Sequence, residues 1–227
     1  VKTYAASDEL PDMFNVDADA YTNILLENGL IQDITPVIEE NGLDEIFLAA
    51  PLAWGRTSDG VQIAIPIDYS IEVFWYNKAI FEDAGIEIPK TFDEFLDICE
   101  TLKTAGYTPI SVAGKEQWTL LRYIDMVTYK YGDNQYLFDL ARNKVDFSGE
   151  IGTKGSQFLA DLGQYFQEGF ASTDYTSAKE YFTGGNAAIY YNGTWDLDSF
   201  MNENLSEDMQ DNVGYFLLPT VNEGDTE

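Results

Sequence analysis

Histidine is absent from this 227-residue chain, and cysteine occurs once, as Cys99. The lack of histidine excludes histidine-dependent catalytic triads and histidine metal sites within the chain. A single cysteine excludes an internal disulfide bond. Cys99 falls in a helical pattern of apolar residues, so we expect it to be a small buried side chain.

Basic residues are also scarce, with 12 Lys and Arg against 40 Asp and Glu and a formal net charge of −28. Such a surface repels nucleic acid and anionic membranes, because phosphate binding needs clustered Lys and Arg. The acidic surplus favours solubility, and a metal-binding role is the alternative. The calcium-loop pattern D-x-[DN]-x-[DN]-G does not occur, so we expect no metal and no cofactor.

Long apolar runs are missing too. No stretch is long enough to span a membrane, and no basic-then-apolar leader follows Val1. The chain starts without a turn or cap signal and ends in the loop-like NEGDTE, so we expect a fragment of a longer protein. Apolar residues, in contrast, make up 45% and aromatic residues 15% of the chain, which indicates a folded protein of one large domain or two lobes.

Strand-like and helical patterns alternate in the first half of the chain. We expect strands at residues 10–16, 61–67 and 71–76, and a helix over residues 43–50 that Pro51 ends. Thr35 is the expected N-cap of another helix, with Pro36 at its first position. A capping box of Thr91 and Glu94 begins a further helix, and a strand follows at residues 110–113. This alternation predicts an α/β fold.

Helical patterns dominate from Gly114 onward, which indicates a second, more helical lobe. The expected helices cover residues 116–131, 134–142, 154–168 and 177–182, and the expected strands cover residues 187–191 and 213–218. The second-last strand runs directly into Asn192-Gly193-Thr194-Trp195-Asp196, which opens a helix.

Three places combine polar groups and aromatic rings near the ends of predicted elements. They are Asp68-Tyr69, the group of Glu116, Trp118 and Arg122, and the stretch from Asn192 through Trp195 to Asp196. Trp118 and Arg122 are four residues apart and share a helix face. A flat indole covers the C–H face of a sugar, while carboxylates, amides and guanidinium groups bond its hydroxyls. These groups suit a neutral polyhydroxylated ligand; the alternative for each tryptophan is a packing role in the core.

Several segments in fixed order extend this interpretation. They are PDMF at 11–14, ENGLIQDITPVIEENG at 27–42, the run from GVQIAIPIDYS to KTAGYTPI at 60–110, GKEQW at 114–118 and AAIYYNGTWDLDSF at 187–200. With them the chain resembles the extracellular solute-binding proteins of carbohydrate ABC importers, the group that includes maltose-binding protein. The YNK…F..AGI..P.T..EF element is specific to that family, and the small-residue-Gly-x-Trp element supports it.

The resemblance implies a two-lobe periplasmic-binding-protein-like α/β fold with a hinge, incomplete here at both ends. It places lobe I at residues 1–109, lobe II at 110–214 and a return crossover at 215–227. Trp195 matches the family's sugar-stacking tryptophan, and Trp118 matches an aromatic at the cleft edge of lobe II. Asp17 and Asp19 match a polar sugar contact of lobe I, although helix capping is an equal alternative for this pair. Asp68 and Tyr69 fall at a strand end that faces the cleft.

The leading hypothesis is therefore a non-catalytic, monomeric receptor that delivers an oligosaccharide to ABC transporter permease subunits by lobe closure. The resemblance implies an extracellular protein, either a membrane-anchored lipoprotein or a periplasmic one. The secretion signal and the lipid-modified cysteine of complete members are absent from this chain. A secreted glycoside hydrolase, which needs two facing carboxylates, is the alternative. A receptor for peptides or amines is a third possibility.

Overall fold

The structure is a computed structural model and describes residues 1–16, 20–57, 59–141, 143–201, 205, 207–222 and 225. The chain forms two compact units, Val1–Tyr69 and Ser70–Glu227. The lobe limits at residues 109 and 214 concern the complete protein and stay a prediction.

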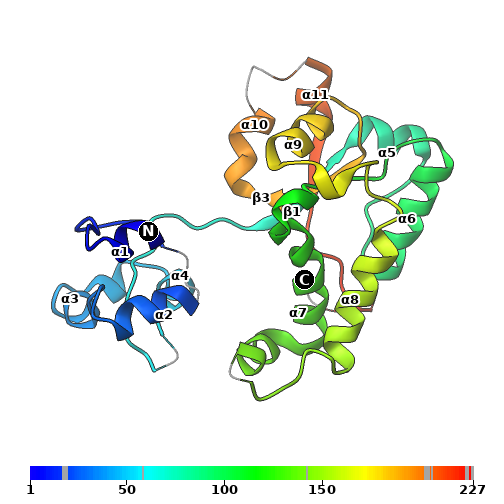
Figure 1. Ribbon diagram of the computed structural model, residues 1–227. Coiled ribbons are helices and arrows are strands. Elements are labelled where there is room, and N and C mark those ends of the chain that lie inside the picture. Colours follow the sequence, from blue (N-terminus) through cyan, green and yellow to red (C-terminus); the bar gives the residue numbers. More distant parts are fainter. Residues whose placement is uncertain are drawn as a thin grey trace. The chain divides into compact units, whose positions relative to one another are not determined.

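The unit Val1–Tyr69 consists of short helices joined by irregular segments (Figure 1). Its elements are α1 (Lys2–Ala6), α2 (Ala20–Glu27), α3 (Thr35–Glu40), η1 (Leu43–Glu45) and α4 (Ala49–Trp54). Gln62 is buried at the centre, where its Nε2 donates to the carbonyl oxygens of Leu52 (2.9 Å) and Ala64 (2.6 Å). Its Oε1 accepts a hydrogen bond from Arg56 Nε at 2.8 Å. These bonds offset the cost of burying an amide and tie the end of α4 to the following segment.

Two strands predicted in this unit do not form. The described residues 10–16 are irregular, and in residues 61–67 the backbone makes one isolated bridge, between Gln62 and Arg56. Apolar alternation is compatible with an extended backbone, but a strand also needs a neighbour for its hydrogen bonds. These two predictions are therefore wrong for the described structure.

Two predicted helix boundaries also differ. Ile34 is the N-cap of α3, because Thr35 Oγ1 accepts a hydrogen bond from the Gln62 N–H at 2.9 Å and does not cap its own helix. Pro51 lies in the first turn of α4 and does not end a helix. Proline is tolerated in a first turn because the N–H groups there have no partner within the helix.

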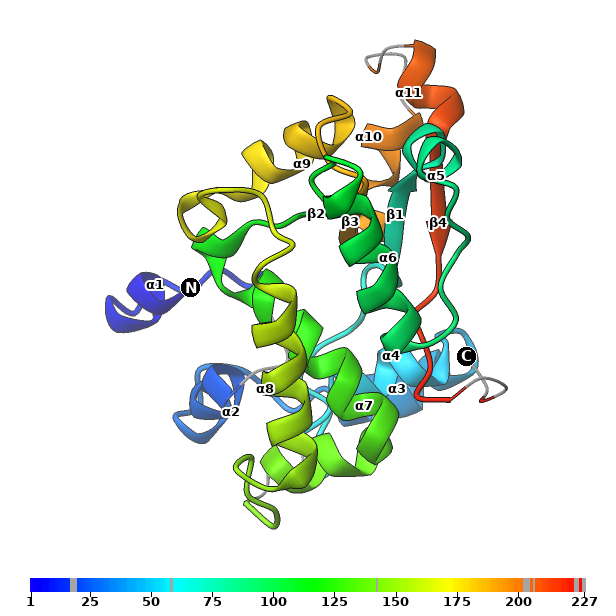
Figure 2. The ribbon, with the colours of Figure 1, turned by 90° about the vertical axis from the view of Figure 1, so that its right-hand side faces the viewer.

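The unit Ser70–Glu227 is built on a four-stranded sheet in the order β2-β3-β1-β4, which Figure 2 shows from left to right. The strands are β1 (Glu72–Asn77), β2 (Ile110–Ser111), β3 (Ile189–Gly193) and β4 (Val213–Phe216). The strand β1 runs antiparallel to β3 and β4, and β2 runs parallel to β3. The strands predicted at residues 71–76, 110–113, 187–191 and 213–218 are thus confirmed, with shifted ends.

Alternate side chains of β1 enter two separate cores. Phe74 belongs to the larger core, to which α6, α7 and α8 contribute. Val73 and Trp75 belong to the smaller core, with Phe182 of α9 and Phe200 of α10. This separation follows from the two-residue period of a strand. Helices therefore cover both faces of a mixed sheet, and the predicted α/β architecture is confirmed.

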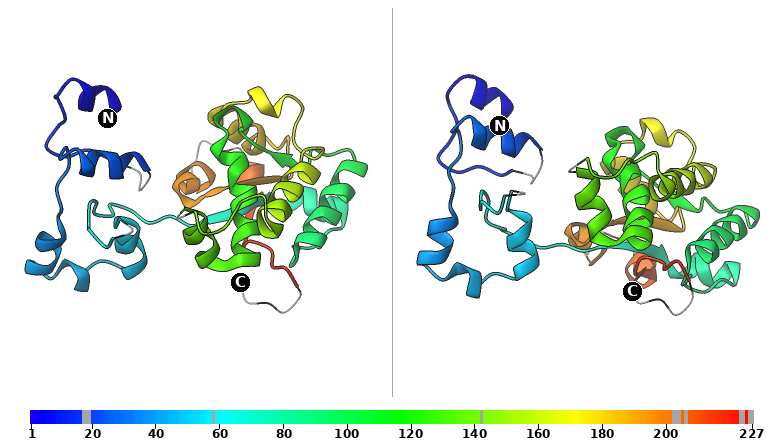
Figure 3. Two further views of the ribbon diagram at one scale, coloured as in Figure 1. Left: turned by 60° about the horizontal axis from the view of Figure 1, so that its bottom comes forward. Right: turned by 90° about the horizontal axis from the view of Figure 1, so that it is seen from below.

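Most helices of this unit lie where the sequence signals predict them, but the helix predicted at residues 154–168 ends at Leu162, so its predicted extension to residue 168 is wrong. The helices are α5 (Lys78–Ala84), α6 (Phe92–Thr104), α7 (Trp118–Ala141), α8 (Glu150–Leu162), α9 (Tyr175–Thr183), α10 (Leu197–Met201) and α11 (Glu207–Asn212). The helix α7 joins two predicted helices, and Asp133 lies between them with a non-helical φ of 54°. The helices α7 and α8 lie side by side, green and yellow-green in Figure 3. Cys99 of α6 is fully buried, as expected, and burial raises the pKa of its thiol.

The helix α6 begins with the predicted capping box. Thr91 Oγ1 accepts from the Glu94 N–H at 3.2 Å, and Glu94 Oε2 accepts from the Thr91 N–H at 3.3 Å. The substitution Thr91→Ala should lower the free energy of unfolding by about 1 kcal/mol, because it leaves an N–H of the first turn without its acceptor. Thr104→Ala, at an exposed position of the same helix, is the matched control. Equal urea-unfolding midpoints for the two variants would contradict a role for the cap.

Candidate functional site

The strand β3 ends at Gly193 and continues directly into η4 (Thr194–Asp196), which carries Trp195. The indole of Trp195 folds back over Gly193. A Cβ at position 193 would lie only 2.0 Å from Trp195 Cζ3, so this close approach requires glycine. The Trp195 side chain is thereby held at the end of the strand while 46% of the residue stays exposed.

Two more rings form a corner with Trp195. The ring centroids of Trp118 and Trp195 lie 6.2 Å apart, with planes inclined by 58°. The rings of Trp118 and Tyr175 stack, with centroids 5.9 Å apart and planes inclined by 28°. Trp118, the first residue of α7, is 36% exposed. Trp118, Trp195 and Tyr175 together make an angled apolar surface, here called the aromatic corner.

The backbone before Trp118 is strained. Gln117 has a φ of 64°, a region that residues with a Cβ rarely adopt. Its carbonyl oxygen nevertheless accepts the N–H groups of Leu120 and Leu121, at 3.0 Å and 3.1 Å, and so starts α7. Strain of this kind persists only where the surrounding structure imposes it. The tight turn at Gln117 thus sets the direction in which α7, and the Trp118 side chain at its start, project from the preceding backbone.

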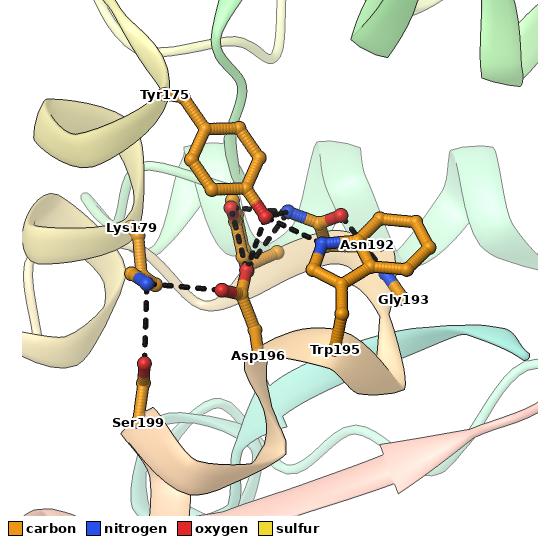
Figure 4. A network of polar contacts seen from close by, with 8 residues as sticks. Tyr175, Lys179, Asn192, Gly193, Trp195, Asp196 and Ser199 are labelled. Atoms are coloured by element: carbon orange, nitrogen blue, oxygen red, sulfur yellow. Dashed lines mark hydrogen bonds and ion pairs between the residues drawn. The ribbon is translucent and has the colours of Figure 1, made fainter. Parts of the chain in front are cut away.

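A buried polar network holds Trp195 and Tyr175 of the aromatic corner (Figure 4). Trp195 Nε1 donates to Tyr175 Oη at 2.6 Å, and Tyr175 Oη donates to Asp196 Oδ2 at 2.6 Å. Asp196 is only 4% exposed and accepts from Lys179 Nζ at 2.9 Å. Lys179 also donates to Ser199 Oγ at 3.1 Å. The one polar atom of the Trp195 indole is thus tied to a buried ion pair.

Asn192 belongs to this network and not to the exposed surface. It is 4% exposed, and its Nδ2 lies 2.7 Å from Tyr175 Oη and 3.0 Å from Asp196 Oδ2. Its Oδ1 accepts from the Gly193 N–H at 2.9 Å. All of its polar atoms are therefore engaged within the protein. Asn192 positions the groups around it and is not placed to contact a ligand directly.

The tyrosine hydroxyl in the network stays protonated at neutral pH. Burial, together with its hydrogen bond to Asp196, raises the pKa of Tyr175 to about 12. A protonated hydroxyl can donate to the carboxylate while it accepts the indole N–H. Burial raises the pKa of the neighbouring Tyr190 as well. The hydroxyls of Tyr175 and Tyr190 therefore both remain hydrogen-bond donors at neutral pH.

Glu116 and Arg122 lie beside the aromatic corner in different ways. Glu116 Oε1 accepts from the Tyr175 N–H at 3.1 Å, and its Oε2 is buried without a hydrogen-bond partner in the described structure. Glu116 thus ties η2 (Gly114–Glu116) to the start of α9. The Arg122 guanidinium lies 5.9 Å from the Trp118 ring centroid, and Arg122 Nε lies 3.1 Å from Glu72 Oε1. The Arg122 side chain is 45% exposed.

The predicted site residues of the first unit are either exposed or lie outside the described residues. Asp68 and Tyr69 are exposed residues at the end of Val1–Tyr69. Asp17 and Asp19 lie outside the described residues. The structure thus brings together five of the predicted residues, all in the second unit: Trp118, Trp195, Asn192, Glu116 and Arg122.

Sequence reasoning missed Tyr175, Lys179 and Glu72. An N-cap signal could have revealed Tyr175, because Asp174 Oδ1 accepts from the Ser177 N–H at 2.9 Å and starts α9 two residues earlier than predicted. No local signal reveals Glu72, whose partner Tyr191 is 119 residues away in the sequence.

The described residues contain neither a candidate membrane span nor a candidate metal site. No helix there has the length and apolar character needed to cross a membrane. No group of histidine, cysteine, aspartate or glutamate side chains in this part of the chain is arranged to hold a metal ion.

The close approach at Gly193 gives a direct test. Gly193→Ala should displace the Trp195 ring, raise its quenching by acrylamide and weaken its near-ultraviolet circular dichroism, because the added methyl group needs the space of the indole. Gly163→Ala is the control, since a Cβ there lies 3.3 Å from its nearest neighbour, the Ala160 carbonyl oxygen. Unchanged Trp195 signals in Gly193→Ala would contradict this geometry; Trp195→Phe identifies those signals.

Comparisons with known proteins identify the family of this chain. Residues 1–226 match the family described as bacterial extracellular solute-binding protein. The multiple sugar-binding protein of Streptococcus mutans is 28% identical over 69% of this chain and 38% of its own length. A probable sugar-binding periplasmic protein of Mesorhizobium japonicum is 27% identical over 76% of this chain and 42% of its own length. The matched parts therefore cover well under half the length of these two relatives.

A solved structure extends the likeness to the fold. A chitin oligosaccharide binding protein superimposes with a TM-score of 0.86 and 27% identity, over 97% of this chain and 55% of that protein. The family match covers nearly the whole chain, and the structural match has the same α/β architecture. The chain belongs to the bacterial extracellular solute-binding proteins.

Proposed function

We propose that this chain is part of an extracellular sugar receptor that binds an oligosaccharide on the aromatic corner. The main supporting observation is the pair of exposed indoles, Trp118 and Trp195, whose ring centroids lie 6.2 Å apart with planes inclined by 58°, and of which Trp195 is held by its hydrogen bond to Tyr175. Two inclined indoles can cover apolar faces of neighbouring sugar rings, and a rigid platform loses little conformational entropy on binding. The names of the relatives, which are sugar-binding proteins, support this proposal.

The polar contacts to the sugar would come from groups with exposed atoms. Arg122 is the candidate on the second unit, because its guanidinium group is half-exposed beside Trp118. Asp68, Tyr69, Asp17 and Asp19 are proposed as contacts from the other lobe, as the family resemblance implies. Asn192, Asp196 and Glu116 would hold the platform in place, since their polar atoms are buried or already bonded.

Delivery to a transporter completes the proposal. Closure of two lobes around the sugar would create the surface that ABC permease subunits recognise. The complete protein would act as a monomer outside the cytoplasmic membrane, in the periplasm or as an anchored lipoprotein. The proposed limits of lobe I and lobe II remain residues 1–109 and 110–214, with the return crossover at 215–227.

Calorimetry of the intact protein against a panel of di- and oligosaccharides tests the receptor proposal. We expect binding heat for at least one neutral oligosaccharide, with the sugar recovered unchanged. The absence of heat across the panel would count against a sugar receptor. Release of smaller sugars would favour the glycoside hydrolase alternative, which the match to a binding-protein family does not support.

The aromatic corner makes a residue-specific prediction. Trp195→Ala should weaken binding of the oligosaccharide by about 30-fold, on the order of 2 kcal/mol, because it removes one of the two exposed indoles. Tyr129→Ala, an exposed aromatic elsewhere on α7, is the matched control and should leave the Kd unchanged. Equal Kd values for the two variants in calorimetry would place the sugar elsewhere.

A further inference from the structure

The bases around the aromatic corner are each paired with a carboxylate. Lys179 Nζ lies 2.9 Å from Asp196, Arg122 Nε lies 3.1 Å from Glu72, and Lys115 Nζ lies 4.0 Å from Asp174. Asp125 and Glu116 are further carboxylates on the same elements. Among the described residues of this surface, carboxylates therefore outnumber bases, and the local charge is negative.

Arg122 is the basic residue best placed to contact a ligand. Its guanidinium group lies 5.9 Å from the Trp118 ring centroid and its side chain is 45% exposed. An unpaired arginine beside an aromatic surface would bind a carboxylate or phosphate through two parallel hydrogen bonds. Here Glu72 lies 3.1 Å from Nε, and Asp125 lies 3.9 Å from Nη1.

Glu72 is itself fixed in place. It is the first residue of β1, where it pairs with Gly193 of β3. Its Oε2 accepts a hydrogen bond from Tyr191 Oη at 2.9 Å, and its side chain is only 20% exposed. Burial raises the pKa of Tyr191, so this hydroxyl remains a donor at neutral pH. A carboxylate held by the sheet and by a tyrosine is not easily displaced by an anionic ligand.

We infer that Glu72 neutralises Arg122 and thereby restricts the aromatic corner to neutral sugars, excluding glycans that carry a carboxylate or a phosphate group. This inference rests on the proposed function for its ligand, although the charge arrangement stands by itself. A neutral sugar loses no hydrogen bond through the pairing of Arg122 with Glu72, because the outer guanidinium N–H groups can still donate to its hydroxyls. An acidic sugar would meet the carboxylates of Glu72 and Asp125 without a free cation to offset them.

The first test needs no sugar. Glu72→Gln removes the charge but keeps an oxygen that can accept from Tyr191. In a Trp54→Phe background the exposed indoles are Trp118 and Trp195, since Trp75 is buried. Their quenching by iodide, relative to neutral acrylamide, should rise about two- to fivefold in Glu72→Gln, because anions gain access to a freed Arg122. Glu150→Gln, which removes the acid of the Glu150–Lys154 pair on α8, is the matched control. An unchanged ratio, or an equal rise in the control, would overturn the inference.

The second test uses xylo-oligosaccharides with and without a glucuronic acid branch, alongside the neutral panel. The wild type should bind neutral sugars and reject the branched acid. Glu72→Gln should shift the ratio of the two Kd values about fivefold toward the acidic sugar. Acidic and neutral sugars bound equally by the wild type would refute the inference. If no neutral sugar binds, the receptor proposal fails, while the iodide ratio still decides whether Glu72 controls the charge of the corner.

Discussion

The two-residue alternation of β1 is the constraint on which the second unit depends. Phe74 points into the core shared by α6, α7 and α8, while Trp75 points into the core with α9 and α10. Phe74 also stacks between Tyr191 of β3 and Phe216 of β4, with centroid distances of 4.6 Å and 5.0 Å. One strand therefore links both helical layers and both neighbouring strands, and cross-strand aromatic pairs of this kind stabilise a sheet.

The ends of β1 connect this core to the surface. Asn77 at one end accepts the N–H groups of Ala79 and Ile80, at 3.0 Å and 3.2 Å, and so caps α5. Glu72 at the other end holds Arg122 beside the aromatic corner. The charge of the proposed site is thus set by a residue whose backbone belongs to a central, largely buried strand. A site supported in this way keeps its geometry without a ligand.

In the aromatic corner, the residues that hold the rings in place differ from the rings proposed to contact the sugar. Asp196 and Asn192 are buried, Lys179 is partly buried, and Asp196 bonds both of them, whereas the Trp118 and Trp195 indoles are exposed. An ion pair in such a place contributes through position, because its desolvation cost offsets much of its attraction. The buried network orients Trp195 through Tyr175, and the exposed rings remain free to cover a sugar.

The sequence by itself determined the features that depend on near neighbours. The capping box at Thr91 and the turn from Gly193 to Trp195 were predictable, because their hydrogen bonds and steric limits lie within a few residues. The strand β1 was predictable from its local residue pattern, although its hydrogen-bonding partners lie in β3 and β4. Trp118, Trp195 and Arg122 could be chosen as candidates from residue type and spacing alone. The α/β class followed from the alternation of strand and helix patterns.

Only the tertiary structure decided which segments have partners. Residues 61–67 have a strand pattern but lack a neighbouring strand in the described structure, and Thr35 bonds Gln62 instead of capping its own helix. The roles of Asn192 and Glu116 could likewise not be read from the sequence. Both were predicted to contact the ligand, but burial of their polar atoms makes them supporting residues. Glu72 meets Tyr191 across 119 residues of sequence, and only the pairing of β1 with β3 brings these two side chains together.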